Sequence, residues 1–547
     1  MSSELRAGIV QLPAAARADA RSVPAPDAAA PPGAVGLCLS GGGSRALTCA
    51  MGQLRALRLL SKLDQVFAIS SVSGGTWANS LFTYLPEGIS DDEFLGPPVL
   101  DPGQLTLRTG LHALDTLPPH SLGRVPARLG VLRDLDAILR LKEKYGYPNF
   151  DLWQGLIGEL VLAPYGLWQA DADGFDRRHV TWTEAFLRAP GGILARNPDL
   201  SAGDFLVVQR PRPFPVFNTS VFTNDGIDAE LLPFEANFSL GVRGWFPRGA
   251  GQPGDMGGGL LASFAMGGSY LGDDGPGSVR TSRPTRPFAL NDIAACSSAA
   301  FAQDLEAQHL DLHGLVPRHD YWPVRNRAEQ PVRNYRFADG GSLENLGVNA
   351  LLARGLGRLI VCVNTDEGVR RHEDSGEIVV SGDLPPLFGL QPFVPGRGYL
   401  PYRSDPGSGA ARLCRHNQVF PMPDFEALKQ ALLAAKLAGG SLLVRQTLQV
   451  LPNAWFGVAG RQPVEVLWVY NDFVRDWWSR LALDVRLAID TEGLGAFPLY
   501  HTATQLALSP TLVNALAHLS CWNLASDSTR GNPQGQTNAQ VVSGMFA

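Results

Sequence analysis

Lysine and cysteine are both scarce in this chain, and each scarcity excludes a class of protein. The 547 residues carry 46 basic and 52 acidic side chains, a net charge of −6, and only five of the basic residues are lysines. No basic block is present, which argues against a nucleic-acid partner and against a polybasic membrane anchor. The six cysteines are isolated, so neither a disulfide framework nor a zinc ribbon is indicated, and a reducing compartment fits.

Long apolar runs are also missing. No uninterrupted hydrophobic stretch approaches 18 residues, so no membrane-spanning helix is predicted. Residues 1–33 are rich in alanine and proline and lack a basic start followed by an apolar core. We interpret them as a disordered tail rather than a signal peptide, and we expect a cytoplasmic protein that associates with membranes at most peripherally.

The residues that are present predict an α/β fold. Hydrophobic residues make up 45% and charged residues 18%, enough for a sizeable core. An apolar run at 34–40 leads into three glycines and a helical pattern at 46–63. A second run at 65–72 leads into two glycines and a helix at 76–85. This alternation is typical of βαβ units on a parallel sheet, and the lack of polar alternation predicts strands covered on both faces.

The rest of the chain completes one large domain, from 34 to 525. A proline-interrupted insertion at about 90–200 carries helical patterns at 132–145 and 152–162. Further expected elements are a strand at 335–338 with a helix at 343–354, a strand at 358–364, and a helix at 425–437. Residues 526–547 are expected to form a flexible tail. The insertion and the glycine-rich loop at 249–277 are candidates for a cap or lid.

A serine turn follows the second expected strand. Ser71-Val72-Ser73-Gly74-Gly75 has the G-x-S-x-G pattern of a nucleophile elbow, with Ser71 in place of the first glycine. Such a turn pushes the hydroxyl of Ser73 outward, and the following helix points its N-terminus at developing negative charge. A turn that only connects two elements is the plainer interpretation.

A glycine turn follows the first expected strand. Gly41, Gly42 and Gly43 expose backbone N–H groups suited to a phosphate or to the oxyanion of acyl transfer. A P-loop lysine and spaced dinucleotide-type glycines are absent, so an oxyanion hole is favoured. Arg45, in the first helical turn, could hold a phosphate headgroup, stabilise the loop, or lie on the surface.

The third turn, Asp339-Gly340-Gly341, supplies a carboxylate that could serve as a base. We expect all three turns at the carboxyl edge of the parallel sheet. Histidine is the usual base, and His501 or His518 could complete a triad, although His518 falls in a helical pattern typical of packing. His309 and His313 have helical spacing without a zinc motif, so no metal site and no cofactor are expected.

Together, Ser-Gly-Gly-Gly-Ser-Arg (40–45), Ser-Val-Ser-Gly-Gly-Thr-Trp (71–77) and Asp-Gly-Gly (339–341) resemble the patatin-like and cytosolic phospholipase A2 superfamily. Further matches favour the cytosolic phospholipase and lysophospholipase branch: Thr76-Trp77, Asp151-Leu152-Trp153, Arg212-Pro213-Phe214-Pro215, Phe234-Glu235 and Asp339 to Asn345. The resemblance implies a three-layer fold, with a central, mostly parallel sheet flanked by helices.

The resemblance also implies a mechanism. Ser73 would be the nucleophile and Asp339 the base of a dyad without histidine. The glycine loop would form the oxyanion hole, and Arg45 would bind the substrate phosphate. The expected activity is hydrolysis of fatty-acyl esters of phospholipids or lysophospholipids during transient membrane contact. No calcium-dependent targeting domain is expected before residue 34.

Two alternatives stay open from the sequence. One is an esterase, thioesterase or acyltransferase that uses the same scaffold on other substrates. The other is a catalytically silent lipid-binding scaffold. The aromatic residues between 468 and 478 could line an acyl channel or form an interfacial surface, although their spacing is more typical of a core.

Overall fold

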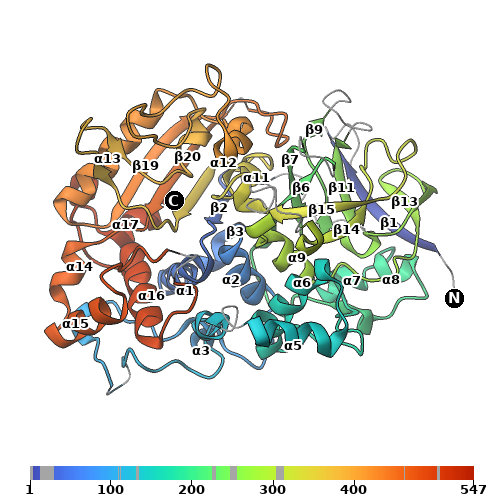
Figure 1. Cartoon of the computed structure of the whole chain (residues 1–547), viewed down its shortest axis with the longest axis horizontal. Coiled ribbons are helices and arrows are strands. Elements are labelled where there is room, and N and C mark those ends of the chain that lie inside the picture. Colours follow the sequence, from blue (N-terminus) through green and yellow to red (C-terminus); the bar gives the residue numbers. More distant parts are fainter. Residues whose placement is uncertain are drawn as a thin grey trace.

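A nine-stranded sheet forms the centre of the computed structural model (Figure 1), which describes residues 4–12, 30–108, 110, 112–130, 135–224, 229–246, 256–302, 313–460, 462–501 and 505–547. The strand order is β14-β15-β6-β3-β2-β16-β20-β19, and β7 also pairs with β6. The strands are β2 (Val35–Leu39), β3 (Val66–Val72), β6 (Phe214–Phe222), β7 (Leu231–Ala236), β14 (Arg318–Tyr321), β15 (Arg333–Asp339), β16 (Arg358–Val363), β19 (Leu442–Gln449) and β20 (Pro463–Tyr470).

The middle five strands, from β6 to β20, run parallel to one another. This confirms the parallel sheet predicted from the strand-glycine-helix pattern. The outer pairings are antiparallel: β15 with β6, β14 with β15, β7 with β6, and β19 with β20. The sheet is therefore parallel at its centre and mixed as a whole.

Helical structure covers both faces of the central strands. On one face, the Ser71 hydroxyl of β3 accepts a hydrogen bond from Asn79 of α2 (Gly74–Thr83) at 3.0 Å. On the other, Ser70 donates to the carbonyl of Gly347, which precedes α11 (Val348–Leu352), at 2.7 Å. Neighbouring strand residues point to opposite faces, so α2 and α11 lie on opposite sides. The long helix α1 (Gly43–Leu59) packs between α2 and α16 (Pro510–Ala525).

The prediction of a loose N-terminal tail is wrong for residues 4–11. They form β1 (Glu4–Gln11), the middle strand of a second sheet ordered β12-β13-β1-β11-β8. Leu5, Ala7 and Ile9 point inward and are each at most 4% exposed. Their partners are β8 (Ser239–Leu240), β11 (Gly259–Ala262), β12 (Tyr270–Asp273) and β13 (Ser278–Ser282). Residues 13–29 lie outside the described part.

The C-terminal segment is also ordered, contrary to the prediction of a flexible tail at 526–547. It contains α17 (Asn538–Ser543), and Val542 and Met545 are fully buried. The Asn538 side chain donates to the hydroxyls of Ser441 and Ser526, both at 2.9 Å. These buried polar contacts attach the segment to the rest of the molecule.

The insertion at 90–200 is helical, as predicted. It contains α3 (Asp91–Leu95), α4 (Arg124–Arg128), α5 (Leu135–Tyr145) and α6 (Leu152–Ile157), which continues as a π-helix over Gly158–Leu162. The lid interpretation of the glycine-rich loop fails from residue 256 onward. That part supplies β11 and β12 to the second sheet, with residues 259–262 buried. Residues 249–255 lie outside the described part.

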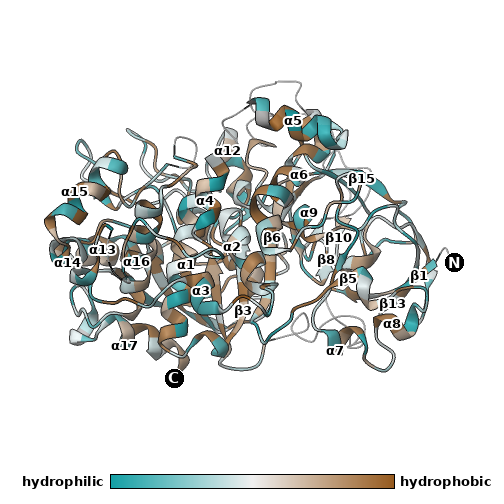
Figure 2. Ribbon diagram, turned by 90° about the horizontal axis from the view of Figure 1, so that it is seen from below, coloured by the Kyte–Doolittle hydropathy of each residue, from teal (hydrophilic) through white to brown (hydrophobic). Residues whose placement is uncertain are grey.

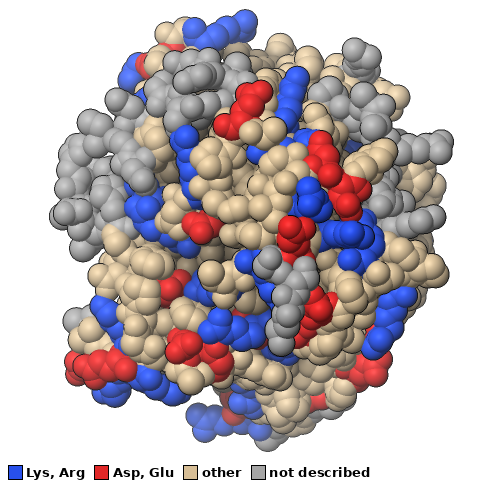
Figure 3. Space-filling view, turned by 90° about the vertical axis from the view of Figure 1, so that its right-hand side faces the viewer, with Lys and Arg blue, Asp and Glu red and all other residues tan. Residues whose placement is uncertain are grey.

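Hydrophobic residues concentrate around the central strands and α1, while the peripheral helix α15 (Leu483–Glu492) mixes hydrophobic and hydrophilic residues (Figure 2). Three of the five aromatics between 468 and 478 are in this core: Trp468, Tyr470 and Trp477 are at most 1% exposed, whereas Phe473 is 37% exposed. On the face seen in Figure 3, basic and acidic side chains are interspersed. None of the described helices combines the length and hydrophobicity needed to cross a membrane.

Candidate active site

Ser73 occupies the turn between β3 and α2 in a backbone conformation that few residues adopt. Its φ and ψ are 50° and −120°, and its side chain is 9% exposed. This strained geometry is what the elbow pattern predicts. The two following glycines permit it, because a Cβ on Gly74 would overlap the Gly43 carbonyl group and one on Gly75 would lie 2.7 Å from the Ser40 carbonyl oxygen. The elbow and the glycine loop therefore touch through their backbones.

Ser71, which replaces the usual elbow glycine, fits without an unsatisfied polar group. Its hydroxyl accepts hydrogen bonds from Asn79 at 3.0 Å and Thr76 at 3.2 Å, and donates to the Val216 carbonyl at 3.4 Å. The side chain thus connects α2 to β6. A small hydroxyl residue at this position is compatible with the elbow.

Ser297 supports the elbow, and sequence reasoning missed it. This last residue of α9 (Leu290–Ser297) accepts hydrogen bonds from the Ser73 N–H through its carbonyl and through its hydroxyl, both at 3.1 Å. The same hydroxyl donates to the Asn218 carbonyl of β6 at 2.6 Å. No motif marks Ser297 in the sequence, because its role depends on where α9 ends.

Asp339 reaches the elbow from a direction that the sequence did not predict. Its strand, β15, runs antiparallel to β6, so the third turn does not follow a parallel strand, although it still lies at the carboxyl edge of the parallel strands, as expected. Val72, the last residue of β3, pairs with Asn218 of β6. Strand β6 extends beyond Asn218, and β15 pairs with this extension. Asp339 therefore ends opposite Thr219, one residue beyond the last paired residue of β3.

The carboxyl group of Asp339 is buried, at 3% exposure, and faces the side chain of Ser73. Burial raises its pKa to about 7, while hydrogen bonding from the Gly341 N–H at 2.7 Å and interaction with Ser73 oppose the increase. A carboxylate with this pKa can accept a proton near neutral pH far better than an exposed aspartate. The structure thus brings together the predicted nucleophile and the predicted base.

The glycine loop lies directly beside Ser73, since a Cβ on Gly41 would be 3.0 Å from the Ser73 Cβ. The three predicted oxyanion donors are not equivalent. The N–H of Gly41 donates to the Asn345 carbonyl at 3.0 Å, so it is not available to a substrate. Gly42 and Gly43 stand at the N-terminus of α1, where the first backbone N–H groups have no acceptor within the helix.

Asn345 connects the glycine loop to the Asp339 turn. A Cβ on Gly341 would lie 2.5 Å from its Oδ1, and one on Gly41 would overlap the same atom. Its Nδ2 donates to the Asp383 carboxylate at 2.9 Å, which orients the amide. The helix predicted at 343–354 begins only at residue 348, because Gly347 has a φ of 73°. Because the helix begins after Asn345, this residue lies in an irregular segment beside the site.

Arg45 is buried beneath the glycine loop, at 5% exposure. Its guanidinium donates to the carbonyls of Asn364 (2.9 Å) and Tyr500, and forms an ion pair with Asp366 at 3.4 Å. Of the alternatives left open by the sequence, these contacts support stabilisation of the loop and oppose a surface position. Binding of a substrate phosphate stays a prediction.

The two histidines considered as triad members lie in other surroundings. His518 is buried in α16, where the Trp477 indole donates to its Nδ1 at 2.8 Å and burial lowers its pKa to about 3. The ring of His501 is 64% exposed and lies 3.8 Å from Asp366. His309 lies outside the described residues. Within the described part, no group of three or more His, Cys, Asp or Glu residues is placed to hold a metal ion.

Comparison with known proteins returned only structural matches. No family model and no curated protein matches the chain. A solved structure of human GIVD cytosolic phospholipase A2 is 13% identical, covers 93% of this chain and has a TM-score of 0.43. The same human protein in complex with methyl gamma-linolenyl fluorophosphonate is 14% identical, covers 94% and has a TM-score of 0.40. The chain spans 60% of the length of each.

Proposed function

We propose that the protein is a serine acyl hydrolase that cleaves fatty-acyl esters of phospholipids or lysophospholipids. The observation that carries the proposal is the meeting of a strained serine elbow with a buried carboxyl whose pKa is raised to about 7. The reaction type rests on this geometry. The substrate class rests on the resemblance of the three turn motifs to the phospholipase superfamily.

In the proposed reaction, the Ser73 hydroxyl oxygen attacks the ester carbonyl carbon while Asp339 takes the hydroxyl proton. The N–H groups of Gly42 and Gly43 stabilise the oxyanion, assisted by the N-terminus of α1. The tetrahedral intermediate expels the alcohol, which receives the proton from Asp339, and leaves an acyl-enzyme. Water then gives a proton to Asp339 as its oxygen attacks the acyl carbonyl carbon. The Ser73 oxygen leaves by taking that proton back, which releases the fatty acid and restores the dyad.

The proposal is tested by labelling with an alkyl fluorophosphonate. We expect wild-type protein to be labelled and Ser73→Ala to remain unlabelled and to lose activity by roughly 10³-fold or more. Asp339→Asn should lose on the order of 10²-fold or more, because the amide cannot accept the proton. Ser61→Ala is a matched control, since Ser61 also has a positive φ, of 54°, but is exposed.

Substrate class is tested separately, by comparing long-chain phosphatidylcholine, lysophosphatidylcholine and a short water-soluble ester. Preference for the two lipids supports the proposal. Faster hydrolysis of the short ester would indicate a general esterase. Labelling of the Ser73→Ala protein, or full activity of Asp339→Asn, would refute the dyad.

A further inference from the structure

A cavity of about 490 Å³ lies along α1, between the start of the insertion and α16. Its volume is within the range of small-molecule pockets. The lining is predominantly apolar and includes Met51, Pro97, Val99, Leu105, Leu114 and Pro118. The cavity therefore has the surface that a hydrocarbon chain requires.

The cavity is distinct from the serine elbow. Met51 and Arg55, which line it, lie 8 and 12 residues after Gly43, the first residue of α1. At 1.5 Å per residue, they are roughly 12 and 18 Å along the helix axis from the end that meets Ser73. A ligand in this cavity would not need the hydroxyl of Ser73.

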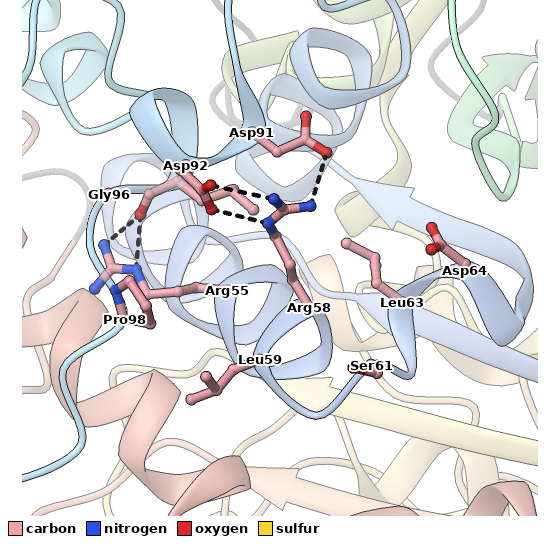
Figure 4. Close-up of a pocket in the computed structure, with 11 residues that line it drawn as sticks. Arg55, Arg58, Leu59, Ser61, Leu63, Asp64, Asp91, Asp92, Gly96 and Pro98 are labelled. Carbon is pink, nitrogen blue, oxygen red and sulfur yellow. Dashed lines mark hydrogen bonds and ion pairs between the residues drawn. The ribbon is translucent and has the colours of Figure 1, made fainter.

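Arg55 brings a buried positive charge to the cavity. It is 6% exposed, and its Nε and Nη2 both donate to the Leu95 carbonyl. No described carboxylate forms an ion pair with it. The Asp92 carboxylate also lines the cavity but pairs with Arg58 at 3.0 Å. Figure 4, a close-up of an adjoining pocket that Arg55 and Asp92 also line, shows the Arg55 guanidinium directed away from that pair, toward Gly96 and Pro98.

A buried charge without a counter-ion is costly, so this arginine is unusual. Arg58, one helical turn later, shows the contrast: it is 44% exposed and yet is matched by both Asp91, at 3.7 Å, and Asp92. The cavity thus has an apolar wall and an uncompensated cation. An apolar molecule with one negative charge complements both features.

His518 adds a second hydrogen-bond donor to the lining. The Trp477 indole donates to its Nδ1, so the neutral ring carries its hydrogen on Nε2. This Nε2 is buried and has no hydrogen-bond partner among the described residues. His112 also lines the cavity, and its buried Nδ1 likewise has no hydrogen-bond partner among the described residues. Arg55, His112 and His518 all line this cavity. Burial lowers the pKa of His518, and the positive charge of Arg55 adds to this effect.

We propose that this cavity binds the anion of a fatty acid, with the carboxylate at Arg55 and His518 and the chain along the apolar lining. The inference goes beyond the proposed function, because binding requires neither Ser73 nor Asp339. A fatty acid is also what hydrolysis at Ser73 would release, so a product of the proposed reaction could occupy a second site on the same molecule.

Isothermal titration of the full-length Ser73→Ala protein with dodecanoate, below its micellar concentration, tests the proposal. We expect binding that Arg55→Met weakens at least tenfold. The matched control Arg58→Met should bind as the parent protein does, because Arg58 already has carboxylate partners. Dodecyltrimethylammonium, with the same chain and the opposite charge, should not bind.

A second variant guards against misfolding of Arg55→Met, and thermal unfolding of each protein identifies such a failure. Ala113→Trp keeps Arg55 and fills the cavity, and it should also weaken dodecanoate binding at least tenfold. Absence of dodecanoate binding, equal binding of the two detergent-like probes, or unchanged affinity in either folded variant would overturn the proposal. None of these outcomes depends on whether fluorophosphonate labels Ser73.

Discussion

Ser73 and Asp339 acquire their properties from different physical sources. The reactivity of Ser73 depends on a backbone held at a positive φ. The packing of two glycine turns and the hydrogen bonds that the Ser73 N–H donates to Ser297 maintain this conformation. The basicity of Asp339 depends on burial, which disfavours the carboxylate and raises its pKa to about 7. The first property is local and the second arises only when distant segments enclose the carboxyl group.

The raised pKa of Asp339 predicts how activity depends on pH. The proposed reaction needs the ionised carboxylate, so kcat/KM should increase with pH and level off above an apparent pKa of about 7. A pH–rate profile on a substrate whose own ionisation does not change in this range measures it. A profile that is flat from pH 5 to 9 would exclude Asp339 as the base.

Stability gives an independent measurement of the same pKa. The unfolded state loses the Asp339 proton near the ordinary value of 3.8, while the folded state keeps it up to about 7. The wild-type protein should therefore lose stability between about pH 4 and 7 relative to Asp339→Asn. At pH 8 we expect the variant to be more stable by on the order of 4 kcal/mol. Urea unfolding of both proteins at pH 5 and pH 8 tests this. If the difference in free energy of unfolding between wild type and Asp339→Asn is the same at both pH values, the prediction is contradicted.

Helix α6 of the insertion and helix α2 of the core both hydrogen-bond to the end of α9, which supports the elbow. The Trp153 indole of α6 donates to the Ala295 carbonyl of α9 at 3.0 Å, two residues before Ser297. Trp77 of α2 donates to the Ser298 hydroxyl at 3.0 Å. The Asp-Leu-Trp motif at 151–153 therefore acts on Ser73 indirectly, by fixing the end of α9.

The close approach of α2 to the glycine loop predicts the effect of a single methyl group. Gly74→Ala would force a Cβ into the Gly43 carbonyl, so we expect a loss of about 1–3 kcal/mol in stability together with reduced fluorophosphonate labelling. Gly88→Ala is the control, because no atom lies within 4 Å of its added Cβ. It should change stability by less than about 0.5 kcal/mol. Equal fluorophosphonate labelling of the two variants would show that the close contact between Gly74 and Gly43 is not needed for the reactivity of Ser73.

The whole molecule joins two large sheets whose strands come from distant parts of the chain. Strand β1 pairs with β13 on one side and β11 on the other, so residues near the N-terminus hold together segments more than 240 residues later. The central sheet similarly joins Ser73 to Asp339 across 266 residues. Most of the chain between Ser73 and Asp339 is thus needed to bring one site together. The single domain over 34–525 stays a prediction, which limited proteolysis would test.

The central place of β1 predicts that its inward residues matter for stability. Ala7 is fully buried, so Ala7→Asp should destabilise the protein by on the order of 3 kcal/mol, because a carboxylate would be buried without a partner. Arg6→Gln is the control, since that side chain is 56% exposed and its ion pair with Asp274 spans 3.7 Å. Thermal unfolding distinguishes the two. A small effect of Ala7→Asp would mean that β1 contributes little.

Much of the site was predictable because its chemistry lies in short, local patterns. The elbow around Ser73 and the glycine loop each follow a buried strand, and both appear where the periodicity predicts them. The N-terminal strand was missed because its alternation of Leu5, Ala7 and Ile9 is brief and lies next to an alanine- and proline-rich segment. Ser297 was missed because no local pattern distinguishes it from other serines.

The parallel core, the elbow and the candidate nucleophile could be predicted from local patterns, since turn chemistry and hydrophobic periodicity act over a few residues. The choice of Asp339 over histidine as the base came from the resemblance of the three turn motifs to a known superfamily. Three features become visible only in the folded chain: β15 runs antiparallel, the Gly41 N–H donates to Asn345, and Arg45 is buried under the glycine loop. The same holds for Arg55, which lacks a carboxylate partner among the described residues. Strand direction, burial and charge pairing depend on segments hundreds of residues apart, and no local pattern encodes them.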